Sequence, residues 1–180
     1  MIYVFLANGF EEIEAIVPID LLRRCELEVV TAGVGGKAIR GAHGITIAAD
    51  ILVEDITLSD DIDMIVLPGG MPGTLNLEHN SFVQSAIDYC VAKNKLIGAI
   101  CAAPSILGNK GLLEGKEATC FPGFEVSLKG ARMSDKLVCV DGNIITAKGA
   151  GVAIPFALKL VEMLCGKERA NTLKAGLQCE

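Results

Sequence analysis

The stretch 95–108, KLIGAICAAPSILG, carries the pattern that decides the fold. Its apolar first half, 96–100, predicts a buried strand. Pro104 suits the first turn of a helix, where its missing N–H costs nothing. Cys101 stands between the two and is followed by two alanines, which are small enough for a crowded turn. Strand, sharp turn and helix together form a nucleophile elbow, which presents a reactive side chain to substrate.

Cys101 has two interpretations at this position. Near the start of a helix, unpaired N–H groups and the helix dipole favour a thiolate, which is the nucleophilic form of cysteine. Free cysteine is also among the most buried residue types, so a core thiol at the end of a strand fits the same spacing. Spacing alone leaves both interpretations open.

Composition limits the class of protein. The 180 residues are 51% hydrophobic, with 20 glycines and six prolines, which is typical of a globular chain with a proper core. We expect a single domain over 1–180. Aromatic residues make up 4% and the net charge is −6, so a nucleic-acid partner is not expected. No apolar run approaches the ~18 residues of a membrane span, so a membrane partner is not expected either.

The cysteines are scattered and do not form a metal motif. Seven occur, none spaced as C-x-x-C, and the two histidines lie far from any cysteine pair. A structural zinc site is therefore not expected, and we predict no metal. Seven separate thiols suit a reducing compartment, so we predict a cytoplasmic protein.

Strands and helices are expected to alternate along the chain. Apolar runs predict strands at 2–7, 27–32, 62–67, 96–100 and 112–120, and a hairpin at 136–147. Helical spacing predicts helices at 11–24, 81–93, 153–165 and 167–177, besides the helix that Pro104 opens. Segments 37–40 and 45–49 suggest a short antiparallel pair, and a loop is expected for about ten residues from Asp50. This alternation predicts an α/β sandwich with a largely parallel sheet.

Three details of these elements are also predicted. Pro18 should kink the first helix or end its first part. The inner face of the helix at 81–93 is expected to comprise Phe82, Val83, Ala86, Ile87 and Cys90. Cys165 is expected on the inner face of its helix.

Several polar or glycine-rich segments follow the strands. In parallel sheets, ligands bind outside the carboxyl ends of the strands. The loop after the first strand, the glycines Gly69 and Gly70, and Cys101 all lie at such ends. Glycines there let backbone N–H groups face a ligand or nucleophile. This shared placement favours a functional site, although each feature alone also fits an ordinary turn or helix start.

Four segments together resemble the ThiJ/PfpI superfamily, in the branch that contains the Parkinson-disease protein DJ and its bacterial relatives. They are GFEEIEAIVPIDLLRR (9–24), IVLPGG (65–70), IGAICAAP (97–104) and KGAGVAIPFALKLVEML (148–164). The resemblance covers essentially the whole chain. It implies a flavodoxin-like three-layer sandwich with helices on both faces of the sheet, a homodimer and an oxidisable cysteine, with no cofactor required.

The resemblance also assigns roles to residues. Cys101 matches the family nucleophile, and Glu14 matches the glutamate that contacts it. Gly70, next to Gly69, and Ala102 match the N–H donors of an oxyanion-type hole, in which substrate would bind. Beside a thiolate, burial and repulsion should raise the pKa of Glu14 and keep it protonated.

One position departs from the pattern. Many superfamily members place a histidine shortly after the elbow, where this chain has Phe121. His43 falls near a position where relatives carry a basic residue close to the pocket, and His79 matches nothing catalytic. A Cys–His dyad is therefore not expected, and peptidase activity is unlikely on these residues.

The resemblance implies a glutathione-independent glyoxalase III or deglycase-type enzyme that acts on methylglyoxal, glyoxal or their adducts. The first alternative is an oxidative-stress sensor or chaperone in which Cys101 is oxidised, because the same residues would stabilise an oxidised sulfur. A weaker alternative is the thiamine-biosynthesis role attached to ThiJ relatives. The sequence does not separate the first two.

Overall fold

A mostly parallel sheet forms the centre of the molecule. The computed structural model describes residues 1–179, and its seven main strands lie in the order β10-β11-β7-β6-β1-β2-β5. Their bounds are β1 (Ile2–Leu6), β2 (Val29–Gly33), β5 (Ile51–Leu52), β6 (Met64–Leu67), β7 (Leu96–Ile100), β10 (Val138–Asp141) and β11 (Ile144–Ala147). Only the β10–β11 pair is antiparallel within this sheet. The predicted α/β class and largely parallel sheet are confirmed.

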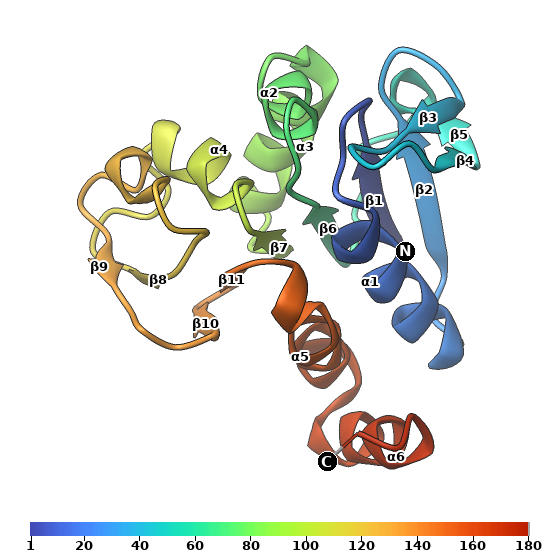
Figure 1. Cartoon of the computed structure of the whole chain (residues 1–180), viewed down its shortest axis with the longest axis vertical. Helices are drawn as coiled ribbons and strands as arrows, with labels where there is room; N and C mark the ends of the chain where they lie inside the picture. The colour runs from blue at the N-terminus through green and yellow to red at the C-terminus, as the bar shows by residue number, and fades with distance from the viewer. Residues whose placement is uncertain (180) are drawn as a thin grey trace.

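Helices cover both faces of the sheet (Figure 1). One face carries α1 (Glu12–Arg24), α5 (Ala153–Cys165) and α6 (Lys167–Gly176), and the other carries α2 (Gly73–Glu78), α3 (Ser81–Ala92) and α4 (Pro104–Asn109). Strand β1 supplies both cores by alternation: Val4 and Leu6 pack toward α1 and α5, whereas Phe5 packs toward α3. Every residue of β1 is buried, as expected of a central strand in a three-layer sandwich.

The first helix continues through Pro18 from Glu12 to Arg24, so of the two outcomes predicted for Pro18, a kink or an end, the end was wrong. Proline removes one hydrogen bond from a helix interior. The inner face of α1, which includes Ala15 and Leu22, is buried against the sheet and α5. This tertiary packing stabilises the helix despite the lost bond, because most helical stability in proteins comes from such packing.

The strand predicted at 112–120 was also wrong. Only β8 (Glu117–Ala118) forms there, and residues 110–115 turn instead. Gly111 and Gly115 both have positive φ, which bends the chain where the apolar Leu112 and Leu113 suggested a strand.

Phe82 was wrongly placed on the inner face of α3, since it is 46% exposed. The inner stripe consists of Val83, Ala86, Ile87 and Cys90, at helical spacing, and Phe82 lies just outside it. Cys165 was likewise misplaced, because it is exposed at the end of α5.

Two short regions differ from the expected loops. The loop expected from Asp50 contains the edge strand β5 and a 3₁₀ turn, η1 (Val53–Asp55). Helix α2 occupies a segment for which no helix was predicted. The expected antiparallel pair does form, as β3 (Ala38–Arg40) and β4 (Thr46–Ala48).

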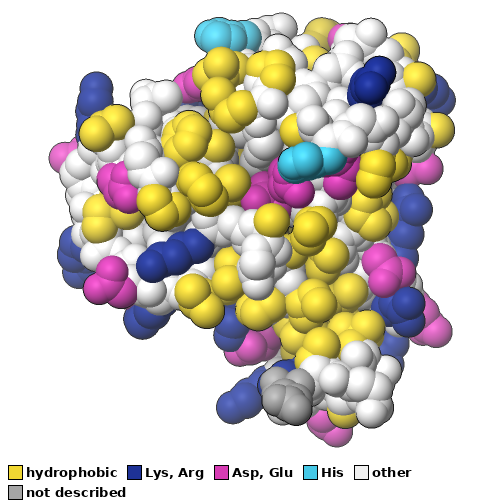
Figure 2. Space-filling view, viewed as in Figure 1, with side chains coloured by type: hydrophobic (Ala, Val, Ile, Leu, Met, Phe, Trp, Pro, Cys, Tyr) yellow, Lys and Arg dark blue, Asp and Glu magenta, His cyan; other side chains and the backbone are white. Residues whose placement is uncertain are grey.

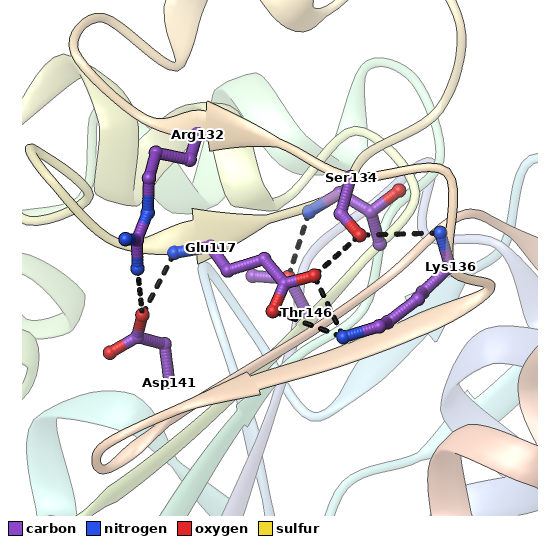
Figure 3. A network of polar contacts seen from close by, with 7 residues as sticks. Glu117, Arg132, Ser134, Lys136, Asp141 and Thr146 are labelled. Atoms are coloured by element: carbon purple, nitrogen blue, oxygen red, sulfur yellow. Dashed lines mark hydrogen bonds and ion pairs between the residues drawn. The ribbon is translucent and has the colours of Figure 1, made fainter.

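A polar network anchors the excursion between α4 and β10 (Figure 3). Strand β8 pairs with β9 (Arg132–Met133). The Glu117 N–H donates to Asp141 Oδ2 at 2.9 Å, and the Glu117 carboxylate accepts from Ser134 and pairs with Lys136. The Thr119 N–H donates to Thr146 Oγ1 at 3.0 Å. These bonds hold the chain against β10 and β11 just before it reaches Phe121.

In the described residues, no helix is long and apolar enough to cross a membrane.

Candidate active site

Cys101 lies at the sharp turn between β7 and α4. Its φ is +65°, a left-handed conformation that is rare for a residue with a side chain. The backbone is held in this conformation from both sides, because the Cys101 N–H donates to Ala147 O at 2.9 Å and its carbonyl accepts from the Phe121 N–H at 2.8 Å. Strained backbone of this kind is concentrated at functional sites. The predicted strand, turn and helix, with Pro104 in the first turn, are present.

Glu14 reaches the elbow from the first turn of α1. Its side chain is 0% exposed, although most carboxylates remain in water. The Gly69 N–H donates to Glu14 Oε2 at 2.9 Å, and the Glu11 N–H donates to the Gly69 carbonyl at 2.9 Å. The N–H of Gly69, a residue that the sequence predicted for the oxyanion and substrate-binding group, therefore positions the Glu14 carboxyl group.

The Glu14 carboxyl group interacts with the side chain of Cys101. Glu14 Oε1 is buried with no geometrically defined hydrogen-bond partner in the described residues. Burial raises the pKa of Glu14 to about 7, while hydrogen bonding with Cys101 and with the backbone of Gly69 and Ala150 lowers it by less. A buried oxygen without a partner costs about 1–3 kcal/mol. Transferring or sharing a proton with sulfur or with a bound substrate would recover that cost.

The charge at the sulfur depends on this carboxyl group. Burial first, and then the Glu14 carboxylate, raise the pKa of the Cys101 thiol to about 12. The N–H groups of Ala102 and Gly70 lower it, as the sequence predicted for this turn, but burial and Glu14 outweigh them. Protonating Glu14 removes the repulsion between the two groups, so carboxyl and sulfur titrate as a coupled pair.

Gly69 lies against both the Glu14 carboxyl group and Cys101, and a residue with a side chain does not fit at this position. A Cβ atom at Gly69 would lie 2.5 Å from Glu14 Oε2 and 2.6 Å from Cys101 Cβ. Both neighbours belong to the packed centre of the site, and one of them is on strained backbone, so neither can move away freely.

We therefore expect Gly69→Ala to destabilise the fold by about 1–3 kcal/mol and to displace Glu14 from the sulfur. Chemical denaturation measures the first effect and the alkylation rate of Cys101 the second. Gly176→Ala is the matched control, because a Cβ there meets nothing within 4 Å. An unfolding free energy for Gly69→Ala within about 0.5 kcal/mol of wild type would show that the site has room at this position.

An acidic pair with a histidine lies beside the site. His43, on the turn between β3 and β4, has its Nδ1 3.1 Å from carboxylate oxygens of both Glu11 and Glu12. These ligand atoms all lie within 4.8 Å of one another, a spacing that a metal ion can use. The hydrogen bond to Glu12, and the charge of Glu11, raise the pKa of His43. Figure 2 shows a histidine over acidic side chains in the middle of this face, bordered by apolar ones.

The structure brings together Glu14, Gly69, Gly70, Cys101 and Ala102. His79 lies elsewhere, in a crevice with Asn8 and Asn76. One neighbour was missed: a Cβ at Gly149 would lie 3.9 Å from Cys101 Sγ, and the Ala150 backbone lowers the pKa of Glu14. The glycine-rich run before the helix at 153–165 was visible in the sequence. Only the tertiary structure shows that this run, which connects β11 to α5, lies next to Cys101.

These features define a class, an α/β protein with a cysteine on a nucleophile elbow and a buried glutamate beside it. Residues 1–163 match the DJ-1/PfpI family. The chain belongs to the DJ-1/PfpI family, which confirms the resemblance drawn from its four sequence segments.

Relatives span nearly the whole chain. Protein dj-1beta of Drosophila melanogaster is 38% identical over 97% of this chain and 94% of its own length. The glutathione-independent glyoxalase DJR-1.2 of Caenorhabditis elegans is 36% identical, over 91% of this chain and 87% of its own. The structure of oxidized Toxoplasma gondii DJ-1 has a TM-score of 0.94 and 37% identity, covering 99% of this chain and 97% of that one. This similarity places the fold with the flavodoxin-like α/β sandwich of that family.

Proposed function

We propose that this protein is a cysteine-dependent glyoxalase III or deglycase-type enzyme acting on methylglyoxal, glyoxal or their adducts. The observation that carries the proposal is the buried Glu14 carboxyl, with a pKa raised to about 7, next to the sulfur of Cys101. A carboxyl group that titrates near neutral pH is suited to move protons in either direction. The name of the nematode relative supports the same chemistry.

The residues provide each part of the reaction. The Glu14 carboxylate takes the thiol proton as the sulfur of Cys101 attacks the aldehyde carbon, and it then passes that proton to the aldehyde oxygen, which gives a hemithioacetal and leaves Glu14 ionised again. The N–H groups of Gly70 and Ala102 stabilise the charge that develops on the oxygen. Glu14 takes the proton from the former aldehyde carbon and returns it to the adjacent carbonyl carbon, which leaves a thioester. Water then hydrolyses the thioester to a 2-hydroxy acid and restores the thiol. One carbon is oxidised and its neighbour reduced, so no external electron acceptor is required.

The pH dependence tests this scheme directly. Below pH 7 the Glu14–Cys101 pair holds two protons and the sulfur is a neutral thiol. Above the Glu14 pKa of about 7 the pair holds one proton, and the second leaves only toward about 12. We expect kcat/KM for methylglyoxal to rise with pH through about 7 and then level off, as measured by 2-hydroxy acid release.

The control for that profile is an equal concentration of a free thiol, since methylglyoxal also reacts with simple thiols. A profile that follows the free thiol, or a turnover no faster than it, would contradict the proposed enzyme. We do not propose peptidase activity, because His43 pairs with Glu11 and Glu12 and Phe121 occupies the position at which a catalytic histidine would be expected.

A redox sensor is the second candidate function, and the pairing of the Glu14 carboxyl group with the Cys101 thiol favours it. A protonated Glu14 and the N–H groups near Cys101 could hydrogen-bond a sulfinate, which is the product of two-step thiol oxidation. Mass spectrometry after peroxide treatment, with no turnover of methylglyoxal, would support this candidate over the enzyme.

We also propose that the chain acts as one domain, in the cytoplasm, as a homodimer. The seven cysteines are all free, as in a reducing compartment. Exposed Ile13 and Ile16 on α1 and Ile154 on α5 lie on two helices that pack together, and apolar surface of this kind is typical of subunit contacts. Light scattering during size-exclusion chromatography measures the oligomeric state.

A further inference from the structure

Phe121 is attached directly to the nucleophilic turn. Its N–H donates to the Cys101 carbonyl at 2.8 Å, and the polar network around Glu117 holds the preceding residues against β10 and β11. The Phe121 ring is nevertheless 47% exposed. An aromatic ring held at a fixed place, but not buried in the core, is available to contact a ligand.

The ring and the sulfur face the same backbone position. A Cβ at Gly149 would lie 3.2 Å from Phe121 Cδ2 and 3.9 Å from Cys101 Sγ. The absence of a side chain at Gly149 therefore keeps the space between ring and sulfur open. A group bound covalently to the sulfur is therefore within reach of the ring.

A shallow cavity of about 290 Å³, open to solvent, lies beside the ring. Its lining is mainly apolar and includes Phe121, Pro122, Ala150 and Val152, with Lys148 as the charged residue in the described lining. The η3 turn (Ala150–Val152) supplies one wall, and that turn follows directly from Gly149. The cavity is large enough for a phenyl ring or a branched alkyl group, and its lining offers few partners for a polar substituent.

We propose that Phe121 and this cavity form a side-chain subsite, which makes the enzyme select α-oxoaldehydes with an aryl or bulky apolar substituent over methylglyoxal. The inference rests on the proposed function and specifies its substrate class. The aldehyde carbon reacts at Cys101, and the substituent on the adjacent carbonyl carbon extends past Gly149 onto the Phe121 ring. A histidine at this position would offer a proton carrier, whereas phenylalanine offers an apolar surface.

The test compares phenylglyoxal with methylglyoxal in wild type, Phe121→Ala and a control, Val126→Ala. Val126 is 80% exposed on the neighbouring turn η2 (Glu125–Ser127) and does not line the cavity. We expect wild type to favour phenylglyoxal in kcat/KM by at least about tenfold, a difference typical of apolar pockets. Phe121→Ala should lower that preference about tenfold, and Val126→Ala should leave it unchanged.

A second measurement separates failure of the subsite from failure of the enzyme. Cys101 is alkylated with iodoacetamide and with N-benzyl iodoacetamide, and peptide mapping reports both rates, with the exposed Cys165 as internal reference. In wild type, N-benzyl iodoacetamide should alkylate Cys101 faster than iodoacetamide does. In Phe121→Ala, the two rates should become similar. If neither aldehyde is turned over, the proposed function fails, and the alkylation ratio still decides the subsite.

Two results overturn the inference. The first is an aryl preference, in turnover and in alkylation, that Phe121→Ala leaves unchanged. The second is that the Phe121→Ala protein dissociates into monomers during size-exclusion chromatography while its preference for aryl substrates stays the same. In that case the ring packs against a second copy of the chain and not against substrate.

Discussion

Replacing Cys101 by serine should lower kcat/KM for methylglyoxal by about 10³-fold or more, the scale of loss when a nucleophile is removed. A hydroxyl group is a far weaker nucleophile than a thiolate and needs a strong base to activate it. Glu14, with a pKa of about 7, is too weak a base to ionise serine. The substitution changes one atom at a turn whose backbone is fixed by Ala147 and Phe121, so the fold should be retained.

The control for this variant is Cys165→Ser. Cys165 is exposed at the end of α5, away from the elbow, and its replacement should leave turnover within about twofold of wild type. Circular dichroism and thermal melting establish that both variants are folded. If Cys101→Ser retains more than about a tenth of wild-type turnover, Cys101 is not the nucleophile and the proposed enzyme mechanism is wrong.

Replacing Glu14 by glutamine should lower kcat/KM about 10²- to 10⁴-fold, the usual range for loss of a general acid–base group. The amide retains an oxygen that can accept from the Gly69 N–H, so the side chain should keep its position. It cannot carry a proton between two carbons. The rise of activity through pH 7 should disappear in this variant, because the group responsible no longer titrates.

The same substitution should stabilise the fold at neutral pH. The Glu14 pKa is about 7 in the folded state against an ordinary value of 4.5 for an exposed glutamate, so between these values the folded protein binds more protons than the unfolded chain. Stability of the wild type therefore falls as pH rises from about 4.5 to about 7, by about 3 kcal/mol in total. Glu14→Gln has no carboxyl group at this position and does not lose stability in this way. In urea denaturation, its free energy of unfolding should equal that of the wild type at pH 4 and exceed it by the full amount at pH 8.

Glu12→Gln is the matched control, two residues earlier on α1. Burial raises the pKa of Glu12, but hydrogen bonds from the backbone and His43 lower it overall. Its stabilising contribution is therefore present at neutral pH and lost in acid, the opposite of Glu14. Glu12→Gln should destabilise the fold at pH 8 and keep most of the turnover. If Glu14→Gln loses stability as well, the carboxyl group serves the fold and not the reaction.

Much of the fold follows from local patterns. Central strands such as β1 and β6 are continuous apolar runs, and α5 shows a clear helical period, so their positions were predicted within about two residues. Failures occurred where local preference and tertiary context disagree. Pro18 is accommodated because its helix is packed on the sheet, and residues 110–115 turn because Gly111 and Gly115 adopt positive φ.

The sequence by itself predicted the strand, turn and helix around Cys101 and, through four segments, the resemblance that paired Glu14 with Cys101 and indicated the family. These depend on neighbours along the chain, or on motifs whose spacing is local. Only the tertiary structure decided that the Gly69 N–H positions Glu14, that His43 pairs with Glu11 and Glu12, and that Gly149 lies between Phe121 and the sulfur. Those contacts join segments that are distant in sequence, and burial, which sets the Glu14 pKa, exists only once the layers have packed together.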